Sequence, residues 1–369
     1  MSAPSSPFKL RVLVAPLDWG LGHATRCIPI VNALLSARAE VVLAGDGRIA
    51  SLLKTEFPHL LLLPLQGYNV KYGKTRLSLL GKMVLHIPNL LKIVEKEHLW
   101  LQEVCKEHRF DVVISDNRYG LFTKSAHCIL ITHQLLIQTG LGGIADRLLQ
   151  KIHYKYINRF NECWIPDHEQ NGIAGVLSHP KHLPAIPTRY IGTLSRFSNQ
   201  TSAKEDHVLI LLSGPEPQRT ILENSILKQL ETYHEPVLLV RGLPGKNEEL
   251  LNSKENIRIA NHLPAAQLEL AINSASFVVA RCGYSTVMDV LTLKKKSILI
   301  PTPGQTEQEY LAKYLMEQGY AWTVKQSGFQ LKEALTKASL FHYNFPEVHD
   351  EEPLKLAIKD LLLGATKRK

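Results

Sequence analysis

A run of small, hydroxyl-bearing and acidic residues at 276–319 has the pattern of a phosphate-binding site. It predicts a strand at 276–280, a turn at Gly283 and a helix that opens with Tyr284. Such a turn directs several backbone N–H groups, and the positive end of a helix dipole, at one place. That place suits a phosphate, and Asp289, one turn into the helix, is well placed to accept ribose hydroxyls. The segment therefore predicts an enzyme site for a nucleotide-linked substrate.

Polar residues beside this turn extend the predicted site. At the turn itself, Gly283, Ser285 and Thr286 can supply amides and hydroxyls to the phosphate. A strand at 297–300 then leads into a rigid Pro-rich loop whose side chains suit sugar hydroxyls. Those side chains are Gln305, Glu307, Gln308 and Glu309. Residues of this kind also cap helices, so each one has a structural alternative.

Two other loops follow apolar strands and contain glycine. Ser213 and Gly214 follow the strand at 208–212 and suit a phosphate or sugar edge, and Arg219 can pair with a diphosphate or remain a solvated helical side chain. The loop at 17–25 contains Gly20, Gly22 and His23. It lacks the third glycine of the dinucleotide fingerprint, and no acidic residue ends the second strand in the usual way. A dinucleotide-dependent dehydrogenase is therefore disfavoured.

Composition limits the class of protein. The 369 residues, 45% apolar and 21% charged, suit a globular chain of two domains. The net charge of +9 admits an anionic membrane, nucleic acid or a phosphorylated substrate, but no nucleic-acid motif is present, so we expect no nucleic-acid partner. The five scattered cysteines predict buried thiols and no metal site. Without a signal peptide or a membrane-length apolar run, we expect a cytoplasmic protein.

The order of the apolar segments predicts an α/β fold. Apolar strands alternate with helices through both halves of the chain, which is typical of parallel sheets covered on both faces. We predict two tandem Rossmann-like, doubly wound domains with a ligand-binding cleft between them. The expected units are an N-terminal Rossmann-like domain at 1–194, a linker at 195–205, a C-terminal Rossmann-like domain at 206–350, and a helix with a basic tail at 351–369.

These loops resemble those of the GT-B nucleotide-sugar glycosyltransferases, in particular the MurG-like enzymes of glycosyltransferase family 28. The first match is Gly20-Leu21-Gly22-His23 after the first strand. The second is Arg281-x-Gly283 followed by Thr286 and Asp289, and the third is Pro301 followed by Gln308 and Tyr310. The layout matches over most of the chain, and the motifs are specific at 20–23 and 261–319.

The resemblance implies that the second domain holds a UDP-sugar. In this family the backbone at Leu263 would meet the uracil, Asp289 would hold the ribose, and Gln308 would hold the donor sugar. The diphosphate would lie at Gly283, Ser285 and Thr286. The helix N-terminus there would stabilise the departing diphosphate, so the resemblance implies an inverting transfer with no metal or other cofactor.

Sugar transfer also needs a base that takes the proton of the acceptor hydroxyl. His23 is the first choice, because the resemblance places it near the reacting centre. Asp116 follows the strand at 111–115 and is the second choice. His133 follows the strand at 129–132 and is the third, since the strand ends all meet at the cleft.

The sequence departs from the family pattern in ways that concern both substrates. Asp18 and Trp19 replace small residues of the first loop, and Glu309 replaces the second Gln of the sugar-binding pair. The family's donor sugar is N-acetylglucosamine. Its Gly-rich acceptor loops are replaced here by 115–120 and 132–134, so we expect a different sugar or lipid-linked acceptor.

Three further hypotheses stay open. The chain could be a nucleotide-sugar epimerase or hydrolase, or a catalytically inactive nucleotide-sugar-binding protein. Two helical stretches, 79–94 and 146–160, mix apolar and basic residues and suit either anionic lipid at the inner face of a membrane or core faces with solvated rims. The first stretch belongs to a long helical region at 77–107 that we expect to be interrupted at Pro88.

Overall fold

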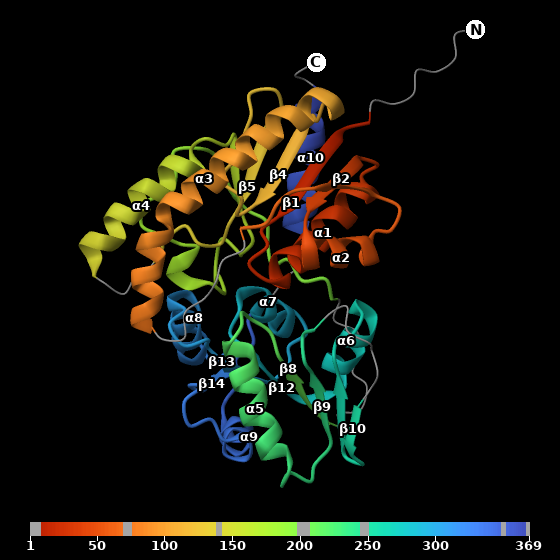
Figure 1. Cartoon of the computed structure of the whole chain (residues 1–369), viewed down its shortest axis with the longest axis vertical. Helices are drawn as coiled ribbons and strands as arrows, with labels where there is room; N and C mark the ends of the chain where they lie inside the picture. The colour runs from red at the N-terminus through yellow and green to blue at the C-terminus, as the bar shows by residue number, and fades with distance from the viewer. Residues whose placement is uncertain are drawn as a thin grey trace.

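The computed structural model contains two α/β domains, which lie one above the other in Figure 1. The chain passes through the first domain (red to yellow-green), then the second (green to blue), and its last helix returns to the first. The structure describes residues 9–68, 76–137, 142–197, 207–243, 251–347 and 352–366.

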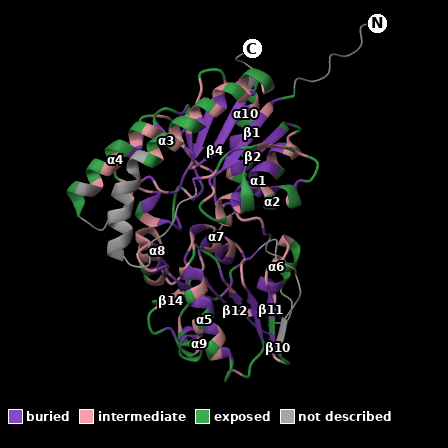
Figure 2. Ribbon diagram, in the orientation of Figure 1, coloured by how far each residue is buried: buried purple, intermediate pink, exposed green. Residues whose placement is uncertain are grey.

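The first domain is built on seven parallel strands in the order β3-β2-β1-β4-β5-β6-β7. Val, Leu and Ile fill both faces of the central strands, which are buried in the middle of the domain (Figure 2). Pro16 pairs with Asp116, and Asp116 pairs with Ile131, so the central strands end level at one edge. The strands are β1 (Arg11–Pro16), β2 (Glu40–Gly45), β3 (Leu61–Pro64), β4 (Val112–Asp116), β5 (His127–Ile131), β6 (Glu162–Ile165) and β7 (Thr188–Tyr190).

The first-domain helices are α1 (Leu21–Ser36), α2 (Gly47–Glu56), α3 (Arg76–His108) and α4 (Gly143–Ile157), with a 3-10 turn, η1, at Gly175–Leu177. The expected interruption at Pro88 is wrong, because α3 continues through that position. A proline removes one backbone hydrogen bond, and a helix of 33 residues has turns on both sides that keep the remaining ones.

The second domain repeats the plan with the order β10-β11-β9-β8-β12-β13-β14. All its strands are parallel except β10, which pairs antiparallel with β11 at one edge. The strands are β8 (His207–Leu211), β9 (Val237–Val240), β10 (Leu251–Lys254), β11 (Ile257–Ala260), β12 (Ala275–Arg281), β13 (Ser297–Ile300) and β14 (Trp322–Thr323). The helices are α5 (Gln218–Leu230), α6 (Ala265–Asn273), α7 (Tyr284–Thr292), α8 (Thr306–Glu317), α9 (Leu331–Leu340) and α10 (Glu352–Thr366).

The two domains share a buried apolar junction. Leu354 and Ile358 of α10 belong to the same buried cluster as Ile28 of α1, so the last helix packs on the first domain. Met288 of α7 and Leu194 lie in this cluster as well, and the Leu194 N–H donates to the Met288 sulfur over 3.3 Å. The junction therefore joins the domains at the level of α1, α7 and α10.

The predicted architecture of two doubly wound domains is confirmed. The strand at 297–300 has the predicted bounds, whereas β7, β10, β14 and α9 were missed. The three missed strands have two to four residues each, too few to give a periodic pattern. The predicted domain limits stay predictions; the two sheets fall on either side of them, and residues 198–205 of the linker and 367–369 of the tail lie outside the described residues.

Candidate functional site

Two helix N-termini, one from each domain, meet at the cleft. Helix α7 lies directly below α1 in Figure 1, and the Ser285 hydroxyl donates to the Gly22 carbonyl over 2.8 Å. A Cβ on Gly22 would lie 2.9 Å from the Ser285 hydroxyl oxygen and 3.3 Å from its Cβ, so a larger residue would disturb this contact. Each N-terminus carries the positive end of a helix dipole, and the corner between them therefore favours an anion.

Glycine also sets the entry to each helix. Gly20 precedes α1 with φ 109° and ψ 170°, a conformation that is accessible essentially only to glycine. Gly283 precedes α7, and a Cβ there would lie 4.0 Å from the side-chain nitrogen of Gln308. Ser285 and Thr286 are half-buried in the first turn of α7. The glycine turns predicted from sequence thus stand at the same corner of the cleft.

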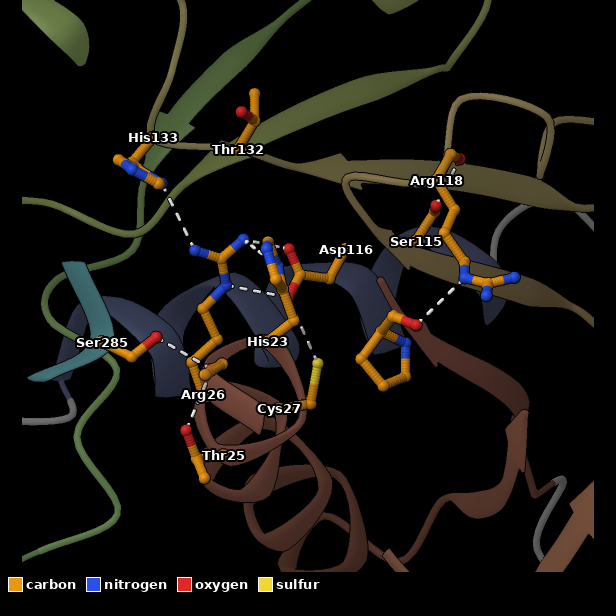
Figure 3. A network of polar contacts seen from close by, with 12 residues as sticks. His23, Thr25, Arg26, Cys27, Ser115, Asp116, Arg118, Thr132, His133 and Ser285 are labelled. Carbon is orange, nitrogen blue, oxygen red and sulfur yellow. Dashed lines mark hydrogen bonds and ion pairs between the residues drawn. The ribbon is translucent and has the colours of Figure 1, made fainter. Parts of the chain in front are cut away.

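His23 and Asp116 come from different segments and form a hydrogen-bonded pair. His23 Nδ1 lies 3.1 Å from Asp116 Oδ2 (Figure 3). Asp116 is fully buried at the end of β4, whereas the His23 side chain keeps 16% of its surface exposed. Burial lowers the pKa of His23; Asp116 opposes that effect, and Arg26 adds to it. The imidazole is therefore neutral near pH 7.

Arg26, which the sequence analysis did not single out, holds Asp116 from the other side. Its Nε donates to Asp116 Oδ2 over 2.8 Å, and its Nη2 donates to Oδ1 (Figure 3). Burial alone would raise the pKa of Asp116, but Arg26 and His23 outweigh it and hold that pKa well below its usual range. One signal could have identified Arg26: a guanidinium in the apolar face of a helix needs a buried partner.

The His23–Asp116 pair has two hydrogen-bonding arrangements. His23 Nδ1 lies 2.9 Å from Arg26 Nη2 as well as 3.1 Å from Asp116. Nδ1 can donate to the carboxylate or accept from the guanidinium, but it cannot do both. Donation to Asp116 leaves a free lone pair on Nε2, the arrangement that a general base requires.

His133 joins the same network and reaches the second domain. Its Nδ1 lies 3.3 Å from Arg26 Nη1, and its Nε2 lies 2.7 Å from Glu307 Oε1. Its ring stacks on Tyr284, with centroids 4.0 Å apart and planes 9° from parallel. Both imidazole nitrogens therefore have partners, and neither is free to take a substrate proton in this arrangement.

Asp289 and Gln308 lie in the second domain, on α7 and α8. Asp289 is half-buried on α7 and accepts a hydrogen bond from the Ser195 hydroxyl over 2.8 Å. Burial raises the pKa of Asp289 to about 6, although Arg196 opposes the effect. Gln308 Oε1 accepts from the Thr302 N–H over 2.8 Å, which leaves its amide nitrogen on the side of Gly283.

The remaining predicted residues of α8 and the neighbouring loops have varied surroundings. Glu309 accepts from the Gly304 N–H over 2.9 Å and so holds the Pro-rich loop, and Gln305 precedes α8 without a side-chain cap. Ser213 and Gly214 are exposed after β8, and Leu263 is half-buried after β11. These positions line the carboxyl edge of the second sheet, as the strand order requires.

Two predicted arginines are engaged inside the second domain. Arg219 pairs with Glu216 at 2.6 Å and with Glu223 at 2.9 Å. Arg281 is 1% exposed and donates to the Gln218 carbonyl over 2.7 Å, and burial lowers its pKa to about 10. Both guanidinium groups hold loops within the second domain, and binding of a diphosphate by Arg219 would require its present ion pairs to open.

Among the described residues, no group of three or more His, Cys, Asp or Glu side chains has the arrangement of a metal site. The cysteines are unbridged, and Cys27, Cys128, Cys163 and Cys282 are buried, as predicted, while Cys105 is half-buried. Among the described helices, none combines the length and apolar character needed to cross a bilayer.

Comparison with known proteins shows which class of protein this chain is similar to. The sequence profile described as the glycosyltransferase family 28 C-terminal domain matches residues 219–361. An uncharacterized glycosyltransferase of Methanosarcina acetivorans is 24% identical over 339 residues, with 84% of each chain covered. A UDP-N-acetylglucosamine–N-acetylmuramyl-(pentapeptide) pyrophosphoryl-undecaprenol N-acetylglucosamine transferase of Caldicellulosiruptor saccharolyticus is 24% identical, with 75% of this chain and 76% of that one covered.

The fold has close counterparts among solved structures. The glycosyltransferase of kitacinnamycin superposes with a TM-score of 0.63 at 15% identity, covering 98% of this chain and 96% of that one. The two domains and their shared cleft therefore define a GT-B protein. The chain is thus similar to MurG-like glycosyltransferases, and its residues 219–361 match the C-terminal domain of glycosyltransferase family 28.

Proposed function

We propose that this glycosyltransferase moves a sugar from a UDP-sugar to a hydroxyl acceptor, with inversion and without a metal ion. The observation that carries the proposal is that the N-termini of α1 and α7 contact each other beside His23. A diphosphate in this corner would be stabilised by two helix dipoles and the Ser285 hydroxyl. These groups supply the charge stabilisation that a metal supplies in other enzymes.

His23 is the proposed general base. With Nδ1 donating to Asp116, its Nε2 takes the proton of the acceptor hydroxyl while the acceptor oxygen bonds to the anomeric carbon. The bond from that carbon to the diphosphate breaks, and its electron pair leaves with UDP. Asp116 is buried and ion-paired, which suits it to orient His23 and stabilise the imidazolium rather than to meet substrate.

Asp289 and Gln308 are the proposed donor ligands. The family resemblance supports Asp289 at the ribose and Gln308 at the sugar hydroxyls, and both side chains lie near Gly283 or in the helix that follows it. One relative is named for transfer of N-acetylglucosamine, so UDP-N-acetylglucosamine is the first donor to test. The acceptor is proposed to be a sugar or lipid-linked hydroxyl compound, since that relative is also named for a pyrophosphoryl-undecaprenol substrate.

A thermal-shift panel of UDP-, GDP-, dTDP- and CMP-sugars tests the donor, and UDP release with added acceptors tests the transfer. We expect a shift with UDP-sugars and UDP release that depends on the acceptor. Release of free sugar without any acceptor would show a hydrolase, and an isomerised donor would show an epimerase. Tight UDP binding with no turnover of any donor would show a catalytically inactive binding protein.

We also propose that the enzyme works against the cytoplasmic face of a membrane, through α4. Three of the exposed residues of this helix are large and apolar: Ile144 is 86% exposed, Leu148 62% and Ile152 48%. They recur every four residues and therefore share one face. Arg147, Lys151 and Lys155 are exposed alongside them, a combination that suits an anionic lipid surface.

Co-sedimentation with phosphatidylglycerol vesicles tests this contact. We expect binding that weakens in high salt and is lost in the Ile144→Ser, Leu148→Ser double variant. The control is Leu340→Ser, which removes an 83% exposed leucine from α9 in the other domain and should leave vesicle binding intact. Equal sedimentation of the double variant and the wild type would rule out α4 as the membrane contact.

A further inference from the structure

A chain of polar side chains crosses the cleft and connects His23 with the donor-binding domain. Asp116 and Arg26 form its first ion pair, and both contact His23. Arg26 then contacts His133, and His133 contacts Glu307 at 2.7 Å. Glu307 stands in the first turn of α8, next to the proposed sugar-binding residue Gln308.

We propose that Glu307 is a positioning residue for His23, which acts through His133 and Arg26 so that the base is complete only when the two domains are together. The role of His23 as base rests on the proposed function. The connection itself rests on the contacts, which hold whatever the enzyme transfers.

The charges of the network explain why a second carboxylate is needed. Arg26 touches His23 and disfavours a proton on the imidazole, while Asp116 favours one. With Arg26, Asp116 and Glu307 ionised, their formal charges sum to −1. A proton on His23 then makes the set neutral, whereas without Glu307 the same proton would leave a buried net charge of +1. Glu307 therefore offsets the cation that holds Asp116 in place.

The hydrogen bonds fix how His133 can connect the two sides. Arg26 is a donor only, so Nδ1 of His133 accepts from it, and Nε2 carries the hydrogen that Glu307 accepts. In this arrangement His133 bridges a guanidinium and a carboxylate. Tyr284, from the same domain as Glu307, covers the ring of His133 and donates to the Pro166 carbonyl over 2.7 Å. The donor-binding domain therefore sets both the position and the hydrogen bonding of His133.

The network that includes His23 is built from four elements and one loop. Its other members are Arg26 and Cys27 of α1, Asp116 of β4, His133 after β5, Tyr284 of α7 and Glu307 of α8. Cys27 and Tyr284 stay neutral, because burial raises the pKa of each well above its usual range. The charges that can change the protonation of His23 are therefore those of Arg26, Asp116 and Glu307, with His133 between them.

The test is a pH titration of His23 by ¹H–¹⁵N NMR of the imidazole rings, in the full chain, with the His23→Gln variant to assign the signals. This readout needs no turnover, so it stays readable if the proposed transfer is wrong. Glu307→Gln should lower the titration midpoint of His23, and Arg26→Met should raise it. The matched control is Glu317→Gln at the far end of α8, where the carboxylate is 59% exposed and pairs with Lys313 at 3.7 Å.

Where transfer activity is present, the acid limb of kcat/KM should follow the titration. We expect it to move up by about one pH unit in Arg26→Met and down by roughly half a unit in Glu307→Gln. Arg26→Met leaves Asp116 buried without its partner and can fail to fold, but Glu307 is 31% exposed and its variant keeps the test available. An unchanged or raised midpoint in Glu307→Gln, or an equal shift in Glu317→Gln, would overturn the proposal.

Discussion

Donor binding should depend on pH through Asp289. The pKa of this carboxyl is raised to about 6, chiefly because it is buried, so its charge changes within an accessible pH range. An ionised carboxylate accepts hydrogen bonds from ribose hydroxyls better than a protonated one does. Because the pKa in the folded protein is raised, the ionised form is present above about pH 6 and is lost below it. The affinity for donor should therefore fall as the pH falls.

The size of the effect follows from the ionised fraction. With a pKa of about 6, Asp289 is about 97% ionised at pH 7.5 and about 10% ionised at pH 5. Hydrogen bonds to a charged group contribute about 1.5–3 kcal/mol, so donor binds much more weakly to the protonated form of Asp289. The change in Kd between the two pH values is then set by the change in the ionised fraction of Asp289. The Kd should therefore rise about tenfold between pH 7.5 and pH 5. Asp289→Asn should bind about tenfold more weakly at pH 7.5 and show little change with pH.

Isothermal titration calorimetry with UDP-N-acetylglucosamine measures the Kd of the wild type and of Asp289→Asn at both pH values. The intact donor is preferable to UDP, because a terminal phosphate itself titrates near pH 6. A thermal melt of apo Asp289→Asn is the control: the midpoint should not fall, since the substitution removes a buried charge whose pKa is already raised. A wild-type Kd that stays the same at both pH values, or an Asn variant with the full pH dependence, would refute the reasoning.

The other predictions concern the base, the close approach of the domains and a buried ion pair. His23→Gln should lower turnover by roughly 10²–10⁴-fold and leave the donor Kd within about threefold in calorimetry, whereas His133→Gln should lose less than His23→Gln; equal losses would remove His23 as the base. Gly22→Ala, whose Cβ would meet the Ser285 oxygen at 2.9 Å, should weaken donor binding severalfold, while Gly364→Ala, with nothing within 4 Å, should not; equal Kd values in both would contradict the close approach. Glu97→Leu should lower the free energy of unfolding in urea by about 3–5 kcal/mol, because it removes the buried carboxylate that pairs with the fully buried Arg118 at 3.1 Å. Glu103→Gln, in an exposed pair, should change it by less than about 1 kcal/mol, and similar losses in both would show that the Arg118 pair is not structural.

The apolar strands and glycine turns made most of the fold predictable. Runs such as β1 and β12 are apolar on both faces, so they predict buried parallel strands whose carboxyl ends share one edge. That rule predicts Asp116 and His133 at the edge of the first sheet that faces the second domain, and the resemblance adds His23. The resemblance to family 28 added the donor roles, which no pattern of apolar residues could supply.

The contacts within the site were not predictable, because their partners are far apart in the sequence. Arg26 and Asp116 are 90 residues apart, and His133 and Glu307 are 174 apart. The spacing of residues along the chain therefore cannot predict which of these side chains pair. Arg219 shows the opposite case: Glu223 lies four residues further along α5 and Glu216 lies three residues back, just before the helix, so both ion pairs join close neighbours in the sequence.

The central claim is that a diphosphate binds where α1 and α7 meet. A crystal structure of the protein soaked with UDP-N-acetylglucosamine tests it most directly. We expect diphosphate oxygens within hydrogen-bonding distance of the backbone N–H groups at Gly22 and Ser285, the Ser285 hydroxyl turned from the Gly22 carbonyl to the phosphate, and Asp289 on the ribose. A nucleotide bound elsewhere, with the Ser285–Gly22 hydrogen bond intact, would contradict the account.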